Sequence, residues 1–94
     1  MALQEEFHNY YEHLVVDYIF EKYQRDPTLT EYLPDIACVA LNHLPPRYIH
    51  YDIDMAYYLS PNERVEMESK VRKAVDDAVL FVRVRRSKEK EAEL

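Results

Sequence analysis

Three segments of the chain place apolar residues at helical spacing, three or four positions apart. The first segment spans 3–24 and predicts one long helix with an apolar stripe formed by Phe7, Tyr10 or Tyr11, Leu14 and Tyr18. More apolar side chains widen this stripe, namely Val15, Val16, Phe20 and Tyr23. A stripe of this width favours a helix that is covered on more than one side, as at a subunit interface.

The second predicted helix runs over 35–43 and ends at a rigid corner. Pro34 and Asp35 form a helix start, because proline suits the first turn and a carboxylate accepts its free N–H groups. Pro45-Pro46 ends the helix, since neither residue has an N–H and each restricts the residue before it. Arg47 and Tyr48 follow directly, so the sequence places a cation and an aromatic ring on a stiff backbone.

The third predicted helix has the clearest start in the chain. Ser60 caps it, Pro61 occupies its first position and Glu63 completes a capping box. We expect this helix to continue to about residue 84, with a stripe formed by Met67, Val71, Ala74, Val75, Ala78 and Val82. Residues 87–94 are predicted to be a frayed tail after the basic run that begins at Arg83.

Between the corner and the third helix, 47–55 alternates with a period of two, which predicts a short strand. No second clear strand is present, so the same segment of another subunit is the candidate partner; an irregular loop packed on the helices is the alternative. His50, Asp52 and Asp54 share one face of this predicted strand. Such a set can bind a metal, although solvated strand faces commonly look the same, and we predict no metal site.

Composition indicates one small, mainly α-helical domain over 1–94, with three helices and one short extended segment. A chain of 94 residues buries a modest core, so dimerisation is a plausible way to complete it. The single cysteine, Cys38, cannot form an internal disulfide, and its apolar neighbours predict that it is buried.

Charge and residue usage exclude several classes of function. The net charge of −6 argues against general nucleic-acid binding but leaves room for a local basic pocket. The absence of glycine excludes Gly-rich phosphate loops, and no catalytic motif is recognisable, so we do not expect an enzyme. No apolar stretch approaches the length of a membrane span, and the acidic N-terminal residues do not resemble a signal peptide. The sequence therefore predicts a soluble, cytoplasmic protein.

The run DIACVALNHLPPRYI, residues 35–49, resembles the signature of the late competence development (ComFB-like) family. The resemblance extends more weakly over 9–15 and over 60–64 and the helix that follows. It implies a small, dimeric, helical protein, and several members of that family are receptors for cyclic dinucleotides. Many members also bind zinc through cysteines just before the central helix. Here residues 25–33 contain no cysteine, so we expect no zinc.

The resemblance and the corner together predict a regulatory protein that binds cyclic di-GMP, or cyclic di-AMP, as a homodimer. Arginine offers a planar fork to phosphate or guanine, and tyrosine offers a stacking surface for a purine. Arg47 and Tyr48 are the leading candidates; the segments that match the family add Asn42, Arg64, Asp35 and Tyr10. The alternative is a dimeric module without a small ligand that docks a larger regulator, because interfaces are also rich in Tyr and Arg. A structural role for Arg47 and Tyr48, in an ion pair and in core packing, is the competing interpretation of these residues.

Overall fold

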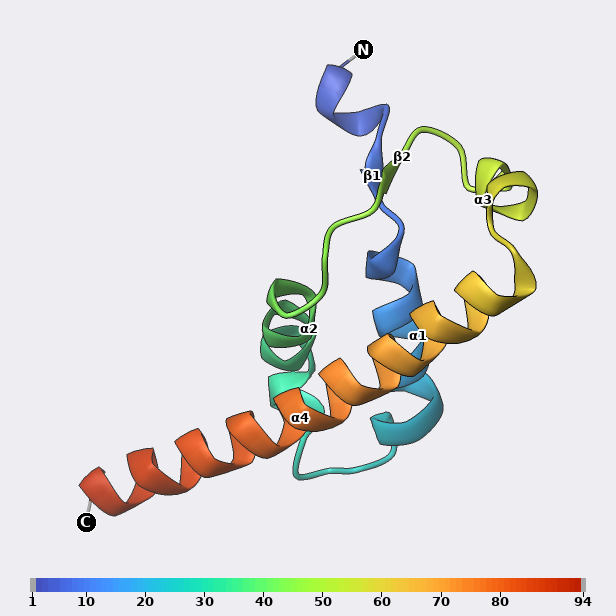
Figure 1. Cartoon of the computed structure of the whole chain (residues 1–94). Coiled ribbons are helices and arrows are strands. Elements are labelled where there is room, and N and C mark those ends of the chain that lie inside the picture. The colour runs from blue at the N-terminus through green and yellow to red at the C-terminus, as the bar shows by residue number, and fades with distance from the viewer. Residues whose placement is uncertain (1, 94) are drawn as a thin grey trace.

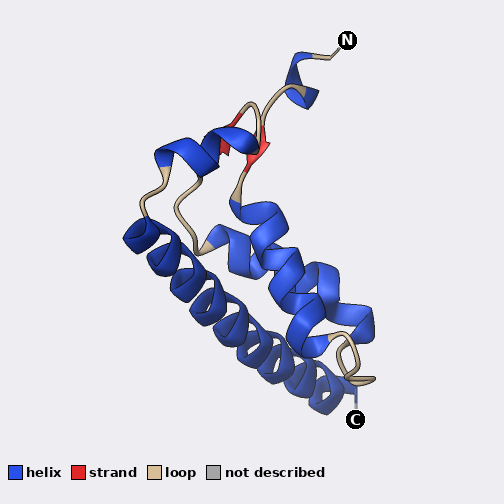
Figure 2. Ribbon diagram, turned by 90° about the vertical axis from the view of Figure 1, so that its right-hand side faces the viewer, coloured by secondary structure: helices blue, strands red, loops and turns tan. Residues whose placement is uncertain are grey.

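The computed structural model describes residues 2–93, and it confirms the predicted mainly α-helical class. In chain order the elements are η1 (Leu3–Glu5), β1 (His8–Asn9), α1 (Tyr11–Tyr23), η2 (Thr30–Tyr32), α2 (Leu33–Asn42), β2 (Tyr48–Ile49), α3 (Ile53–Tyr58) and α4 (Pro61–Glu93). The long α4 packs against both α1 and α2, while β1 and β2 lie together at one end of the helical layer (Figure 1). Figure 2 shows α1 and α2 on the same side of α4.

The core lies where α1, α2 and α4 meet. Each helix contributes the residues that its apolar period predicts, so α1 buries Tyr11, Val15 and Ile19 at successive four-residue steps. On α4 the buried residues include most of the predicted stripe, namely Met67, Val71, Val75, Ala78 and Val82. Leu29, from the connection between α1 and α2, is also fully enclosed. Leu29 therefore anchors the connection 25–32 to the core.

The prediction of one helix over 3–24 is wrong at its N-terminal part. The chain forms η1 and β1 before α1 begins at Tyr11. The break is at Asn9, whose side-chain Oδ1 accepts the backbone N–H of Tyr11 at 3.1 Å. Glu12 in turn accepts the backbone N–H of Asn9 at 3.3 Å, so the side chains of Asn9 and Glu12 each bind a backbone N–H at the start of α1.

The extended segment after the corner is shorter than predicted. Only Tyr48–Ile49 forms a strand, and α3 begins at Ile53, so the alternation over 50–55 does not mark a strand. Its partner is not a second subunit but β1 of the same chain, antiparallel, with His8 opposite Ile49 and Asn9 opposite Tyr48. Because β1 lies inside the segment predicted to be helical, the sequence analysis had no strand to pair with β2.

The other two predicted helices are present with shifted ends. The central helix is α2, which begins at Leu33 and places Pro34 in its first turn. Ser60 caps α4 as predicted, with its Oγ accepting the backbone N–H of Glu63 at 3.2 Å. The predicted end near residue 84 is wrong, because α4 continues to Glu93. Residues 87–93 of the expected frayed tail are therefore helical, and residue 94 lies outside the described part.

Cys38 was predicted to be buried, but it lies on the exposed side of α2.

A polar cluster joins α1 to α4 beside the core. Asp76 accepts hydrogen bonds from the hydroxyl of Tyr23 at 2.6 Å, from the hydroxyl of Tyr18 at 3.1 Å and from Lys22 Nζ at 3.2 Å. Partial burial acts to raise the pKa of the Asp76 carboxyl, but the three donors outweigh it and hold the pKa below the ordinary value of 3.8. The cluster therefore stabilises the α1–α4 contact through a charged carboxylate.

Candidate functional site

The corner after α2 is fixed by backbone contacts with the start of α1. Leu44 is buried, and Pro45 and Pro46 then carry the chain out of the helical layer. The backbone N–H of Arg47 donates to Asn9 Oδ1 at 3.0 Å, and the carbonyl oxygen of Arg47 accepts the N–H of Tyr10 at 2.7 Å. Both backbone groups of Arg47 are therefore bonded to a neighbouring segment, which holds this residue in place.

Asn9 is the residue on which this arrangement depends. Its side chain is only 8% exposed, and its Oδ1 accepts hydrogen bonds from two segments, through Tyr11 N and Arg47 N. An oxygen with two lone pairs can satisfy both donors at once. One buried amide thus caps α1 and ties the corner to it.

The side chain of Arg47 lies at the surface beside α4. It lines a small cavity of about 190 Å³ with Tyr11, Pro45, Pro46, Leu59, Glu63, Glu66, Met67 and Lys70. Among the side chains of residues 2–92, its guanidinium has no partner in a hydrogen bond or ion pair that would fix it to the protein. Burial raises the pKa of the Tyr11 hydroxyl, and the positive charge of Arg47 acts in the opposite direction. The guanidinium is therefore positioned by its backbone and available to a ligand.

Arg64 and Tyr10 line a neighbouring cavity, which shares two residues with the cavity of Arg47. They line a second small cavity, of about 270 Å³, together with Leu14, Leu59, Met67 and Glu68. Leu59 and Met67 belong to both cavities, so Arg47, Arg64 and Tyr10 surround the same two buried side chains. The structure thus brings these three predicted residues together at the N-terminal end of α4.

The other three predicted residues are not part of this group. The ring of Tyr48 is 62% exposed and meets the ring of Phe7 edge-to-face, with 5.9 Å between centroids. Asn42 is exposed at the end of α2. Asp35 lies in the first turn of α2 and lines a different cavity, shared with Cys38 and Arg85. Tyr48 is adjacent to Arg47 in sequence, and its exposure contradicts the competing interpretation that it packs in the core.

The segment predicted to offer a metal-binding face does not form one. His50 Nε2 lies 3.4 Å from Glu6 Oε2, whereas Asp52 Oδ1 lies 2.7 Å from His8 Nε2. The two side chains therefore have separate partners on the N-terminal segment. Among the described side chains, those of residues 2–92, no three of His, Cys, Asp or Glu are grouped in a way that could hold a metal ion.

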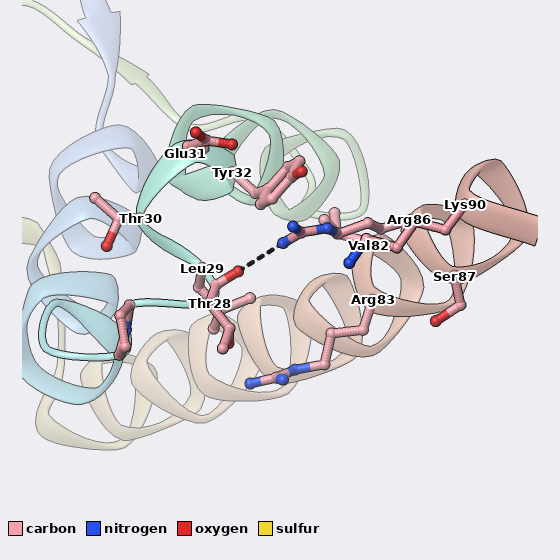
Figure 3. A pocket seen from close by; sticks show the side chains of 11 residues that line it. Thr28, Leu29, Thr30, Glu31, Tyr32, Val82, Arg83, Arg86, Ser87 and Lys90 are labelled. Atoms are coloured by element: carbon pink, nitrogen blue, oxygen red, sulfur yellow. Dashed lines mark hydrogen bonds between the residues drawn. The ribbon is translucent and has the colours of Figure 1, made fainter. Parts of the chain in front are cut away.

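A larger groove, which was not predicted from the sequence, lies at the other end of α4 and is shown in Figure 3. It has a volume of about 860 Å³ and lies between the connection 27–32 and the last turns of α4. Arg83, Arg86 and Lys90 line it from the helix, and Thr28 and Tyr32 line it from the connection. The basic run was visible in the sequence, but a helix predicted to end near residue 84 could not place Arg86 and Lys90 beside Thr28.

With this geometry established, the comparison with known families is informative. The model of the family described as late competence development protein ComFB matches residues 8–86. This range contains Asn9, the Pro-Pro corner, Arg64 and most of α4, and it confirms the resemblance seen in residues 35–49. The chain belongs to this family.

Two further comparisons gave no match. Neither the curated proteins nor the solved structures include one that matches this chain. Across residues 2–93, none of the helices combines the length and the apolar character needed to cross a bilayer.

Proposed function

We propose that the protein binds a cyclic dinucleotide, with cyclic di-GMP as the preferred ligand, and that it acts by binding rather than by catalysis. The observation that carries this proposal is the state of Arg47. Both of its backbone groups are hydrogen-bonded, yet its exposed guanidinium has no partner among the described side chains of residues 2–92. An ion pair with the scaffold, which was the competing interpretation of this residue, is not among the described contacts.

A fixed backbone makes Arg47 an efficient ligand contact. A residue that is already positioned loses less conformational entropy when its ligand binds than one on a mobile loop. The guanidinium fork can donate two parallel hydrogen bonds to a phosphate or to the O6 and N7 atoms of guanine. The exposed face of Tyr48, the next residue, is available for stacking on a purine. Guanine therefore suits this corner better than adenine.

Arg64 and Tyr10 extend the proposed site along α4. Both flank Leu59 and Met67, which also border the cavity of Arg47. The acidic side chains Glu63 and Glu66 lie in the same cavity, so the phosphate contact is assigned to the outer, solvent-facing end of the Arg47 side chain. Asn42 and Asp35 lie apart from this group and line neither of its cavities.

A homodimer is part of the proposal. A cyclic dinucleotide has an approximate two-fold axis, and an isologous dimer presents each half with the same arginine and tyrosine. The segment 48–58 supports an interface, because its aromatic and aliphatic side chains are largely exposed in the isolated chain: Tyr48, Tyr51, Ile53, Tyr57 and Tyr58. Exposed apolar clusters of this kind mark surfaces that become covered by a partner.

The same exposed segment supports a second candidate function. In this alternative the protein is a dimeric interaction module that docks a larger regulator and binds no small ligand. Tyr57 and Tyr58, which are 79% and 72% exposed, would then contact the regulator. The two functions differ in one measurable property, since only the first requires Arg47 for affinity toward a cyclic dinucleotide.

Isothermal titration calorimetry with cyclic di-GMP and cyclic di-AMP separates the two functions. Loss of one charge-assisted hydrogen bond costs roughly 1.5–3 kcal/mol, so we expect Arg47→Ala to weaken binding at least about tenfold. Arg47→Lys should restore only part of the affinity, because lysine keeps the charge but not the fork. Arg72→Ala is the matched control, since Arg72 is an exposed arginine of α4 that lines neither cavity. Unchanged affinity in Arg47→Ala, or no binding by the unmodified protein, would favour the interaction module.

A further inference from the structure

The groove at the C-terminal end of α4 has the size and lining of a ligand site. Its volume of about 860 Å³ falls within the range of roughly 300–1,000 Å³ that is usual for sites of small organic ligands. Leu29 and Val82, both buried, form its apolar base. Cationic side chains of α4 form one wall, as Figure 3 shows.

Arg86 is the residue that points to a ligand. It is partly buried, its guanidinium carbon lies 4.6 Å from the centroid of the Tyr32 ring, and its Nη1 donates to the carbonyl oxygen of Thr28 at 3.1 Å. Among the side chains described, those of residues 2–92, no carboxylate lies within ion-pair distance of it. A partly desolvated cation without a counter-ion is costly in free energy, and an anion bound in the groove would act as the counter-ion of Arg86.

Arg83 shows how the same helix behaves where the protein supplies the anion. Its Nη2 donates to Asp26 Oδ2 at 3.0 Å. The Asp26 carboxyl also accepts hydrogen bonds from the Thr28 hydroxyl and the Thr28 backbone N–H, and together with Arg83 these hold the pKa of Asp26 below its ordinary value. The connection thus neutralises Arg83 but leaves Arg86, three residues further along, without such a partner.

The remaining polar groups of the groove suit a phosphate. Lys90 follows Arg86 by four residues and therefore lies on the same side of α4. Ser87 adds a hydroxyl on the same wall. Glu31 is the one acidic residue among those that line the groove, and Figure 3 shows it at the opposite end from Lys90. A fork and a point charge on one wall are the pair of groups that phosphate-binding sites use most.

We propose that this groove binds an organic phosphate, such as a nucleoside diphosphate, with Arg86 and Lys90 holding the phosphates and the apolar base contacting the organic part. The apolar base and the volume favour an organic phosphate over a free inorganic ion. The site is separate from the Arg47 corner. Lys70 borders the cavity of Arg47 and Lys90 borders the groove, and twenty residues of α-helix span about 30 Å.

Titration of the isotope-labelled full chain with ADP, without divalent cations and at physiological ionic strength, tests this proposal. We expect the backbone amide resonances of the connection 28–32 and of 83–90 to shift when ADP binds. The dissociation constant for ADP should be at least about tenfold larger in Arg86→Gln than in the unmodified protein. Lys88→Gln is the matched control, because it removes the same charge from the same run but does not line the groove. Lys88→Gln should change the constant less than about twofold, since exposed charges are largely screened at this ionic strength.

Two further measurements keep the result decisive. Arg86 packs on Tyr32, so its substitution can also affect folding. Arg86→Lys, which retains the charge, is therefore compared with Arg86→Gln after thermal unfolding has shown that the two variants are equally stable. We expect Arg86→Lys to bind ADP with an affinity between that of Arg86→Gln and that of the unmodified protein. Pyrophosphate is the second probe, and we expect it to bind more weakly than ADP because it lacks the organic part. Absence of ADP binding at millimolar concentration, equal loss in Lys88→Gln and Arg86→Gln, or pyrophosphate binding as tightly as ADP would overturn the proposal.

Discussion

The buried side-chain oxygen of Asn9 accepts the backbone N–H of Arg47 at 3.0 Å, across 38 residues of sequence. The same oxygen accepts the N–H of Tyr11, the first residue of α1. The position of the proposed ligand-binding arginine is therefore set by the same residue that binds the first N–H group of α1. Stability of α1 and geometry of the corner are coupled through one amide group.

This relationship predicts that Asn9→Ala both destabilises the protein and weakens ligand binding. The substitution leaves two backbone N–H groups, those of Tyr11 and Arg47, without an acceptor, which costs roughly 1–3 kcal/mol. Asn62→Ala is the control, because Asn62 is exposed in the first turn of α4. Urea unfolding measures the free energy, and a loss in Asn9→Ala no greater than that in Asn62→Ala would show that these hydrogen bonds contribute little.

The polar cluster on Asp76 predicts a pH-dependent contribution to stability. The pKa of Asp76 is lower in the folded protein than in the unfolded chain, so its contribution is complete above about pH 4 and is lost as the pH falls through the folded value. Asp76→Asn should therefore lower the free energy of unfolding by about 1–2 kcal/mol at pH 6, a figure reduced by the partial exposure of this side chain. The difference from the unmodified protein should narrow below pH 4.

Asp77→Asn is the matched control for this measurement. Asp77 pairs with Lys73 at 2.9 Å one turn away, and both side chains are well exposed. Exposed pairs of this spacing contribute only about 0.3–0.5 kcal/mol. Equal effects of the two substitutions at pH 6, or a difference for Asp76→Asn that stays constant below pH 4, would argue against the cluster as the source of the stability.

The account also predicts a dimer in solution. The aromatic and aliphatic side chains of 48–58 are largely exposed in the single chain, and a second subunit would cover them. Sedimentation equilibrium at micromolar concentration should give about twice the chain mass of 11.3 kDa. A single species at 11.3 kDa would contradict the dimer, and with it the proposal that two identical subunits bind the two halves of a cyclic dinucleotide. The exposed segment 48–58 would then be a surface for a different protein partner.

The elements that the sequence predicts well are those with a strong local signal. Ser60, Pro61 and Glu63 identify the start of α4, and the apolar period along α4 identifies its buried residues. The start of α1 was missed because the apolar period continues through Phe7 and Tyr10 across the break. Asn9 and Glu12 have the spacing of a capping box, and this signal could have found the start.

The site was predictable in part for the same reason. Proline stiffness identified the corner, but its attachment to Asn9 depends on a contact between segments 38 residues apart that no local pattern encodes. The grouping of Arg47 with Arg64 and Tyr10 arises from the packing of α4 and of the residue after α3, since Leu59 and Met67 neighbour both cavities only in the folded chain. The groove at Arg86 could not be predicted from a helix ending near residue 84, because its residues 86–90 lie on the part of α4 beyond that end.

The central claim is that the Arg47 corner binds a cyclic dinucleotide, and a backbone amide shift map with cyclic di-GMP tests it most directly. The account predicts the largest changes at Arg47, Tyr48 and Ile49 and, across the paired strands, at Asn9 and Tyr10, because these amides lie at or next to the corner. It predicts little change over 28–32 and 83–90, because residues 83–90 lie about 20–30 Å along α4 from Lys70 at the Arg47 cavity and 28–32 lies beside them. Changes confined to those two segments, or no change at saturating ligand, would contradict the claim.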